Sequence, residues 1–173
     1  MKTDRGGHID SFEDPTFHFP AIRGIQAGKE YYITMFPLKV IPKLLSFDDS
    51  DLPPKMRAQR TLNHARVPVI AKYLTSNPKD YVLSSITASV DGDVQFFPSG
   101  QRGDDSKIGQ LIVPMTAKIV VNDGQHRKAA IEAALKSRPE LGLDTISVVL
   151  FMDLGLKRSQ QMFADLNKHA VPP

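Results

Sequence analysis

The segment IVVNDGQHRKAA, residues 119–130, predicts the local fold and contains the side chains that indicate most about function. An apolar run ends at Asn122, Asp123 and Gly124, and an alanine-rich helical pattern follows directly. This order predicts a strand, a tight turn and a helix over about residues 124–137. At such a junction the free backbone N–H groups and the positive end of the helix dipole point the same way, so the turn can hold an anion.

The side chains of this turn indicate specific candidate chemistry. Asp123 is expected to cap the helix, which places His126 and Arg127 in its first turn. Arg127 presents a planar fork that matches phosphate or carboxylate, and His126 can donate to the same anion or act as an acid–base group. Gln125 can orient a water molecule or a base edge, and Gly124 lets a ligand approach the backbone closely. The alternative is a plain capped turn with solvated side chains, although a cation at a helix N-terminus opposes the dipole and so favours a bound anion.

The composition indicates a globular protein of one domain. The chain has 173 residues, 41% of them hydrophobic and 24% charged, which is enough for one packed core. It contains no cysteine, which excludes disulfides, thiolate metal sites and cysteine nucleophiles. The five histidines form no HxH or HxxxH pair, so no intrinsic metal site is predicted.

Charge and hydropathy indicate in which compartment the protein is expected and which partners it could bind. No apolar run approaches the roughly 20 residues that cross a bilayer, and the polar N-terminus lacks a signal-peptide core. A cytoplasmic protein without a membrane partner is therefore expected. The formal net charge is +3, which is compatible with a DNA partner without requiring one.

The order of elements predicts an α+β fold. Residues 1–20 are interpreted as a loose lead-in, and residues 21–173 as a single domain that could be truncated at its C-terminus. Strand patterns occupy residues 22–25, 31–36, 82–90, 94–97, 108–113, 117–121 and 145–152, and helical patterns occupy 55–63, 67–76, 124–137 and 156–167. The dipeptide Asp91-Gly92 predicts a hairpin that joins the strands on either side of it. Residues 117–152 have the strand–helix–strand order and the length of a βαβ unit, so we expect a mixed sheet flanked by helices.

A basic helical face is the second candidate site. Arg57, Arg60 and His64 have i, i+3, i+7 spacing and would share one face of a helix. The candidate DNA-binding residues are Arg57, Arg60, Asn63, His64, Arg66 and Lys72. Such a face supplies phosphate contacts and no sequence readout by itself. A merely solvated face is the alternative, and Asn63 can equally cap the next helix.

A third candidate lies at the end of the last helical pattern. Asn167 and Lys168 are candidate phosphate- or nucleotide-binding residues, and Asp165 with Asn167 could hold a divalent cation beside a nucleotide. The alternative is that Lys168 only complements the negative end of the helix dipole.

Three motifs carry a family resemblance. They are NDGQHRKAAI at residues 122–131, LNHARVP at residues 62–68 and SQQMFADLNKHAV at residues 159–171. In this order they resemble the DGQHR-domain proteins, and among these the DNA sulfur modification protein DndB family. The resemblance implies a transcriptional regulator of the bacterial DNA phosphorothioation (dnd) gene cluster that binds double-stranded promoter DNA. A regulator of symmetric operators would often be a homo-oligomer.

The same turn is more distantly similar to the ParB-N/sulfiredoxin fold. Sulfiredoxins carry Gly-Cys-His-Arg here, so Gly124, His126 and Arg127 match while Gln125 replaces the nucleophilic cysteine and excludes that chemistry. ParB proteins carry Gly-Glu-Arg-Arg, and both families contact nucleotide phosphates with this turn. The resemblance therefore implies ATP with Mg²⁺ as a modulator of the regulator. Alternatively, the protein is an ATP hydrolase whose candidate catalytic residues are Asp123, Gln125, His126 and Arg127.

Overall fold

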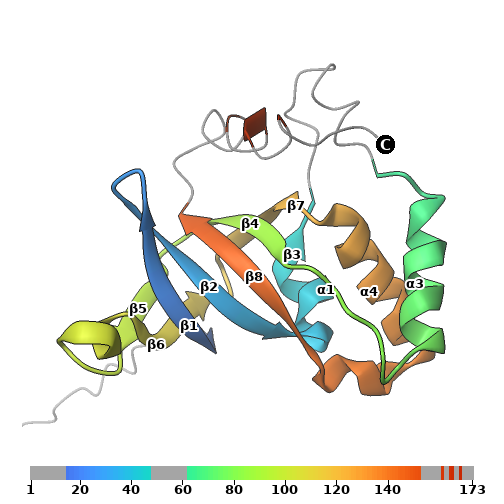
Figure 1. Cartoon of the computed structure of the whole chain (residues 1–173), viewed down its shortest axis with the longest axis horizontal. Helices are drawn as coiled ribbons and strands as arrows, with labels where there is room; N and C mark the ends of the chain where they lie inside the picture. Colours follow the sequence, from blue (N-terminus) through green and yellow to red (C-terminus); the bar gives the residue numbers. More distant parts are fainter. Residues whose placement is uncertain (1–14, 48–61, 153–160, 162–163, 166–167, 169–173) are drawn as a thin grey trace, which may run out of the picture.

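A computed structural model describes residues 15–47 and 62–152, together with Gln161, Ala164, Asp165 and Lys168 (Figure 1). Its centre is a mixed sheet of eight strands in the order β3-β7-β4-β8-β2-β1-β6-β5. The strands are β1 Thr16–Gln26, β2 Lys29–Pro37, β3 Leu45–Ser46, β4 Ile86–Asp91, β5 Gln95–Pro98, β6 Ile108–Pro114, β7 Lys118–Asp123 and β8 Thr145–Met152. The expected α+β class with a mixed sheet flanked by helices is confirmed.

The helical elements connect these strands. They are η1 Leu38–Val40, α1 Ile41–Leu44, α3 Arg66–Ser76, η2 Gly103–Ser106, α4 Gln125–Ser137 and η3 Pro139–Leu143. α3 and α4 pack side by side, and both begin at the same end of the molecule (Figure 1). Leu74 of α3 and Ile131 of α4 are fully buried in the core. This burial follows from the helical spacing of the apolar residues in each segment.

Strands β1 and β2 form a hairpin with a two-residue turn, because Gln26 pairs with Lys29. Ala27 and Gly28 both have positive φ, at 50° and 73°, as a turn that matches the right-handed twist of the strands requires. β1 begins at Thr16, so residues 16–20 are strand rather than loose lead-in. Phe19 explains the difference, since it is 5% exposed and pairs with Leu111 of β6.

The predicted hairpin at Asp91-Gly92 is wrong. β4 pairs with β7 on one side and β8 on the other, while β5 pairs with β6 at the far edge of the sheet. β5 is short and largely exposed, whereas β4 buries Ile86, Ala88 and Val90 at the centre of the sheet. Burial of β4 between two long strands therefore outweighs the local turn preference.

The strand–helix–strand order of residues 117–152 is confirmed, but its strands are not parallel neighbours as in a βαβ unit. β4 lies between β7 and β8, antiparallel to β7 and parallel to β8. β7 and β8 consequently run in opposite directions, and α4 connects them across β4. The helical patterns expected over residues 55–63 and 156–167 fall mainly outside the described residues.

One sheet face carries an apolar row across four strands. Ile22 pairs with both Ile108 and Ile33, and Ile33 pairs with Val149. Directly paired residues point to the same face. Ile22, Ile33 and Ile108 are 41–51% exposed, so no described element covers this row. None of the described helices is long and apolar enough to cross a membrane.

Candidate anion and nucleic-acid interface

Gly124 forms the turn between β7 and α4. Its backbone is left-handed, with φ 104° and ψ 18°, and a Cβ there would lie 3.0 Å from both Arg127 Nη2 and Ile86 Cγ1. Glycine is thus required by the backbone angle and by the close packing together. α4 begins at Gln125 with Gly124 as its N-cap, and no described side chain caps it. The expectation that Asp123 caps the helix is therefore wrong, and His126 occupies the second helical position.

The Arg127 side chain forms its hydrogen bonds within the protein. Its Nη2 donates to the carbonyl oxygen of Ser85 at 2.9 Å and to Asp123 Oδ2 at 3.1 Å. The Arg127 side chain is 23% exposed, and its Nε–H is buried with no hydrogen-bond partner among the described residues. This guanidinium ties α4 to the residue before β4 and to the end of β7. Asp123, 50% exposed, serves as its ion-pair partner instead of as a cap.

His126 is a hydrogen-bond acceptor. The backbone N–H of Asn63 donates to its Nε2 at 2.8 Å, so a neutral ring must carry its proton on Nδ1. Burial lowers the pKa of His126 below its ordinary value, and the nearby charges of Arg66 and Arg127 lower it further, against the smaller opposing effect of Asp123. In this state Nε2 cannot donate to an anion.

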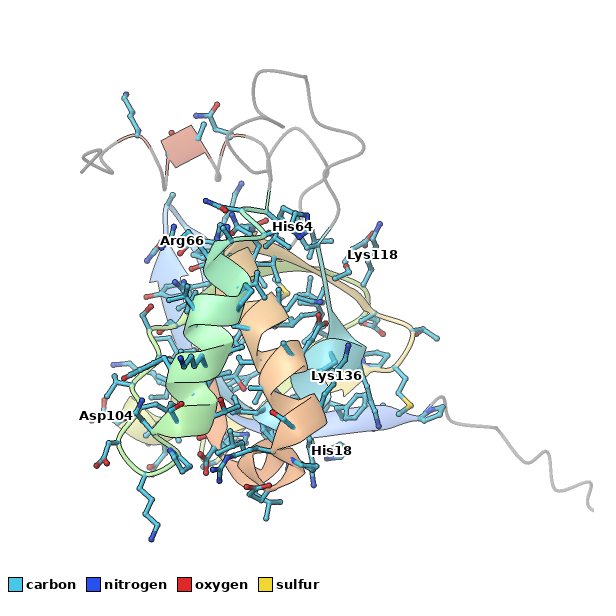
Figure 2. All side chains as sticks on the ribbon, turned by 90° about the vertical axis from the view of Figure 1, so that its right-hand side faces the viewer. His18, His64, Arg66, Asp104, Lys118 and Lys136 are labelled. Atoms are coloured by element: carbon cyan, nitrogen blue, oxygen red, sulfur yellow. The ribbon has the colours of Figure 1, made fainter. Side chains whose placement is uncertain are left out.

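Asn63 organises the start of α3. Its Oδ1 accepts from the backbone N–H of Ala65 at 3.0 Å, and its carbonyl oxygen accepts from the backbone N–H of Arg66 at 3.0 Å. The side chain thus forms a local turn, but it does not cap α3 as expected, because the N-cap is Ala65 and no side chain caps the helix. His64 and Arg66 lie next to it, exposed at the end of the molecule where α3 begins (Figure 2).

The candidate DNA-binding residues are only partly brought together. Arg66 acts electrostatically on His126, so the LNHARVP segment and the DGQHR turn are neighbours. Lys72 is exposed farther along α3, and Arg57 and Arg60 lie outside the described residues. Lys136 marks the opposite end of α4 (Figure 2).

Two helix N-termini and two arginine side chains lie at this end of the molecule. α3 and α4 both direct their N-terminal dipole ends here, with Arg66 and Arg127 beside them (Figure 1). Cations at helix N-termini cost free energy in the absence of a counter-charge. Asp123 offsets part of this charge through Arg127, and Lys128 is paired with Glu132 along the helix.

The sequence interpretation gave no role to two polar residues that support the turn, Ser85 and Asn122. Asn122 is 1% exposed, and its Nδ2 donates to Ser89 Oγ at 2.5 Å, which joins β7 to β4. Ser85 Oγ lies 2.6 Å from Ser147 Oγ, while its carbonyl holds Arg127. Asn122 was visible as part of the motif. No side-chain signal could identify Ser85, because its contact with Arg127 uses the backbone.

The structure gives few contacts for the remaining candidate site residues. Gln125 is half-buried at the first position of α4, and Lys168 is exposed. Asp165 Oδ1 accepts from Gln161 Nε2 at 2.9 Å, whereas Asn167 lies outside the described residues. Within residues 15–47 and 62–152, no group of three or more His, Asp or Glu side chains is arranged to hold a metal ion.

The fold and the site define an α+β protein with a glycine turn and two helix N-termini at one cationic end. Residues 19–173 match the sequence model of the family DndB, described as DNA-sulfur modification-associated. The chain belongs to this family, and the resemblance seen in its motifs is confirmed. No curated protein and no solved structure gives a significant match. The likeness to the ParB-N/sulfiredoxin fold stays a prediction.

Proposed function

We propose that this protein is a double-stranded DNA-binding transcriptional regulator of the DNA phosphorothioation (dnd) gene cluster. Membership of the DNA-sulfur modification-associated family supports the biological context. The convergence of the α3 and α4 N-termini with Arg66 is the observation that supports a phosphate-binding surface. Backbone N–H groups at helix N-termini and arginine side chains are frequent phosphate ligands.

The DNA contact is assigned to residues 63–66 and the adjacent turn. Asn63 and Ala65 form a fixed turn, so His64 and Arg66 are held on a rigid segment. Phosphate contacts from such a segment supply affinity and register, while base reading requires further contacts. Lys72 would extend the cationic surface along α3.

Promoter binding tests this proposal directly. Fluorescence anisotropy with a duplex from the cluster's own promoter, against a shuffled duplex of equal length, should show tighter binding to the promoter. Affinity for both duplexes should fall as salt rises, because phosphate contacts release counterions. Absence of binding at low salt would overturn the proposal.

ATP with Mg²⁺ is the second candidate ligand, acting as a modulator of DNA binding. The first N–H groups of α4 lack a described side-chain cap, and the buried Nε–H of Arg127 has no described partner. The uncapped N–H groups fit a phosphate group, and Mg²⁺ would neutralise part of the phosphate charge. The Arg127 Nε–H is enclosed by the protein and does not face a ligand. Gly124 is buried against Arg127 and Ile86, so its proposed part is to form the turn. Asn167 and Lys168 remain proposed contributors.

ATP hydrolysis at the DGQHR turn is a less favoured alternative. Asp123 is paired with Arg127 and His126 accepts from Asn63, so both are engaged in contacts that hold the fold. Phosphate release from ATP should be compared between the wild type and Arg127→Lys, with circular dichroism to verify folding. Release above background that depends on Arg127 would support a hydrolase, and equal release would remove it.

The third part of the proposal is a homo-oligomer. In it, the apolar row of Ile22, Ile33, Ile108 and Val149 packs against the same row of a second copy of the chain. On the same face, the flanking residues are uncharged: Pro20, Gly24, Tyr31, Met35, Gln110, Ser147 and Phe151. Two such faces can stack without charge repulsion. An exposed row of this kind often marks an interaction surface.

A further inference from the structure

The hydrogen bond between Asn63 and His126 joins two motifs that are 63 residues apart in the chain. Residues 62–65 precede α3 and contain no regular helix or strand. Asn63 uses its side-chain oxygen and its carbonyl to hold Ala65 and Arg66, and its N–H is held by His126. The position of the segment relative to α4 therefore depends on the imidazole acceptor.

Only a neutral His126 can make this contact. Nε2 offers a lone pair in the Nδ1–H tautomer, whereas an imidazolium carries protons on both nitrogens and has no acceptor. The charged groups that face the ring are Arg66 from α3, Arg127 from α4 and Asp123 from β7. The two arginines disfavour a second proton, and Asp123 favours it. Asp123 is already paired with Arg127, so its attraction is reduced.

We infer that His126 is a positioning residue for DNA binding, whose Nε2 holds Asn63 so that His64 and Arg66 face the phosphate backbone. The inference rests on the proposed DNA-binding function. It assigns His126 neither a direct phosphate contact nor a proton-transfer role. It also makes DNA binding depend on the neutral form of this ring.

Under this inference, lowering the pH weakens DNA binding, whereas it usually strengthens DNA binding by a basic surface. Protonation of an exposed histidine on a DNA-binding surface adds positive charge and strengthens DNA binding. Protonation of His126 instead removes the acceptor for Asn63 and loosens the segment. The pKa of His126 is depressed, so its contribution is complete above the ordinary histidine pKa of about 6.5 and is lost as the pH falls through the lower folded value.

Two substitutions separate positioning from direct contact. His126→Leu removes the acceptor at similar volume, and His126→Gln keeps a side-chain oxygen that can accept from Asn63. Lys136→Ala, at the opposite end of α4, is the control for a substitution on the same helix outside the proposed contact. Each variant is measured by promoter anisotropy and by amide hydrogen exchange of Asn63 in the free protein.

We expect His126→Leu to weaken promoter binding about five- to tenfold, the usual effect of one lost hydrogen bond, and to increase exchange of the Asn63 amide. His126→Gln should recover most of both properties. ¹⁵N NMR should show the Nδ1–H tautomer of His126 at neutral pH.

Three results would overturn the inference. They are an unprotected Asn63 amide in the wild type, undiminished promoter binding by His126→Leu, and equal loss in both variants with unchanged Asn63 exchange. The last result would assign His126 to direct anion contact. If the wild type fails to bind the promoter, the proposed function fails, whereas the exchange and tautomer measurements still test the His126–Asn63 contact.

Discussion

Arg127 Nη2 lies 2.9 Å from the carbonyl oxygen of Ser85, although 42 positions separate the two residues in the chain. This contact fastens the first turn of α4 to the segment that enters β4. The same nitrogen reaches Asp123 Oδ2, so one guanidinium joins β7, α4 and the start of β4. The arginine of the DGQHR motif therefore has a structural role whether or not it also binds phosphate.

Replacing Arg127 with lysine should destabilise the protein by about 1–2 kcal/mol, because the guanidinium plane fixes the N–H bonds of Nη2 toward Ser85 and Asp123, and a freely rotating ammonium group does not reproduce that geometry. Urea unfolding measures the change. Arg138→Lys is the matched control: its ion pair with Glu140 joins side chains that are 43% and 62% exposed, so a change below about 0.5 kcal/mol is expected. Equal effects at the two positions would contradict the structural role of Arg127.

Gly124→Ala should cost more stability than Gly28→Ala. Both glycines have positive φ, at 104° and 73°, which costs an L-residue about 1–2 kcal/mol. At Gly28 an added Cβ meets nothing within 4 Å, whereas at Gly124 it meets Arg127 and Ile86 at 3.0 Å. Thermal or urea unfolding of both variants isolates the steric part. A cost at Gly124 no larger than at Gly28 would show that the Arg127 contact yields freely.

Arg66→Ala should weaken promoter binding about three- to tenfold and reduce the slope of log affinity against log salt by about one. The reason is the loss of one phosphate contact at the start of α3. The same titration of Lys136→Ala should leave the slope unchanged, since this exposed lysine lies toward the other end of α4 (Figure 2). A slope that is unchanged in Arg66→Ala would remove Arg66 from the interface.

Alkaline stability should depend on Tyr32. Burial, with a smaller contribution from the hydrogen bond that its hydroxyl donates to Glu30, raises the pKa of Tyr32 to about 12. The folded protein therefore keeps a proton that the unfolded chain loses near pH 10, and stability present below that pH is lost as the pH rises toward 12. Unfolding midpoints between these values should fall less steeply in Tyr32→Phe. An identical slope in both proteins would contradict this assignment.

Ile33→Lys should prevent self-association without unfolding the protein. Ile33 is 41% exposed at the centre of the row that contains Ile22 and Val149, and a lysine there would place charge at a two-sheet contact. Sedimentation velocity should show an oligomer for the wild type and a monomer for the variant. Ile25→Lys is the control, because Ile25 is 71% exposed but alternates to the opposite face of β1. A monomeric wild type would overturn the proposed contact.

Local sequence patterns predicted the elements better than their pairing. The helix of residues 67–76 is present as α3, one residue longer, and the strand of residues 145–152 is β8. The Asp91-Gly92 hairpin failed because the dipeptide reports a local backbone preference only. β4 instead pairs with β7 and β8, where Ile86, Ala88 and Val90 are buried.

In the candidate site, too, local features were predicted better than contacts between distant residues. Gly124 was predicted as the turn residue, and its left-handed φ agrees. The cap expected at Asp123 was wrong because Arg127 engages its carboxylate. The role of Asn63 was left open between a helix cap and a base contact; its side chain bonds to Ala65 in a local turn and does not cap α3, and the base contact stays a prediction.

The sequence by itself determined the strand, turn and helix around Gly124, since these depend on hydropathy period and on the backbone freedom of one residue. It also determined the DNA-sulfur modification-associated family, through motifs that are contiguous in the chain. Only the tertiary structure decided that Arg127 meets Ser85 and that His126 accepts from Asn63. Those contacts follow from the insertion of β4 beside β7 and from the parallel packing of α3 on α4, which are set by competition among distant segments for burial.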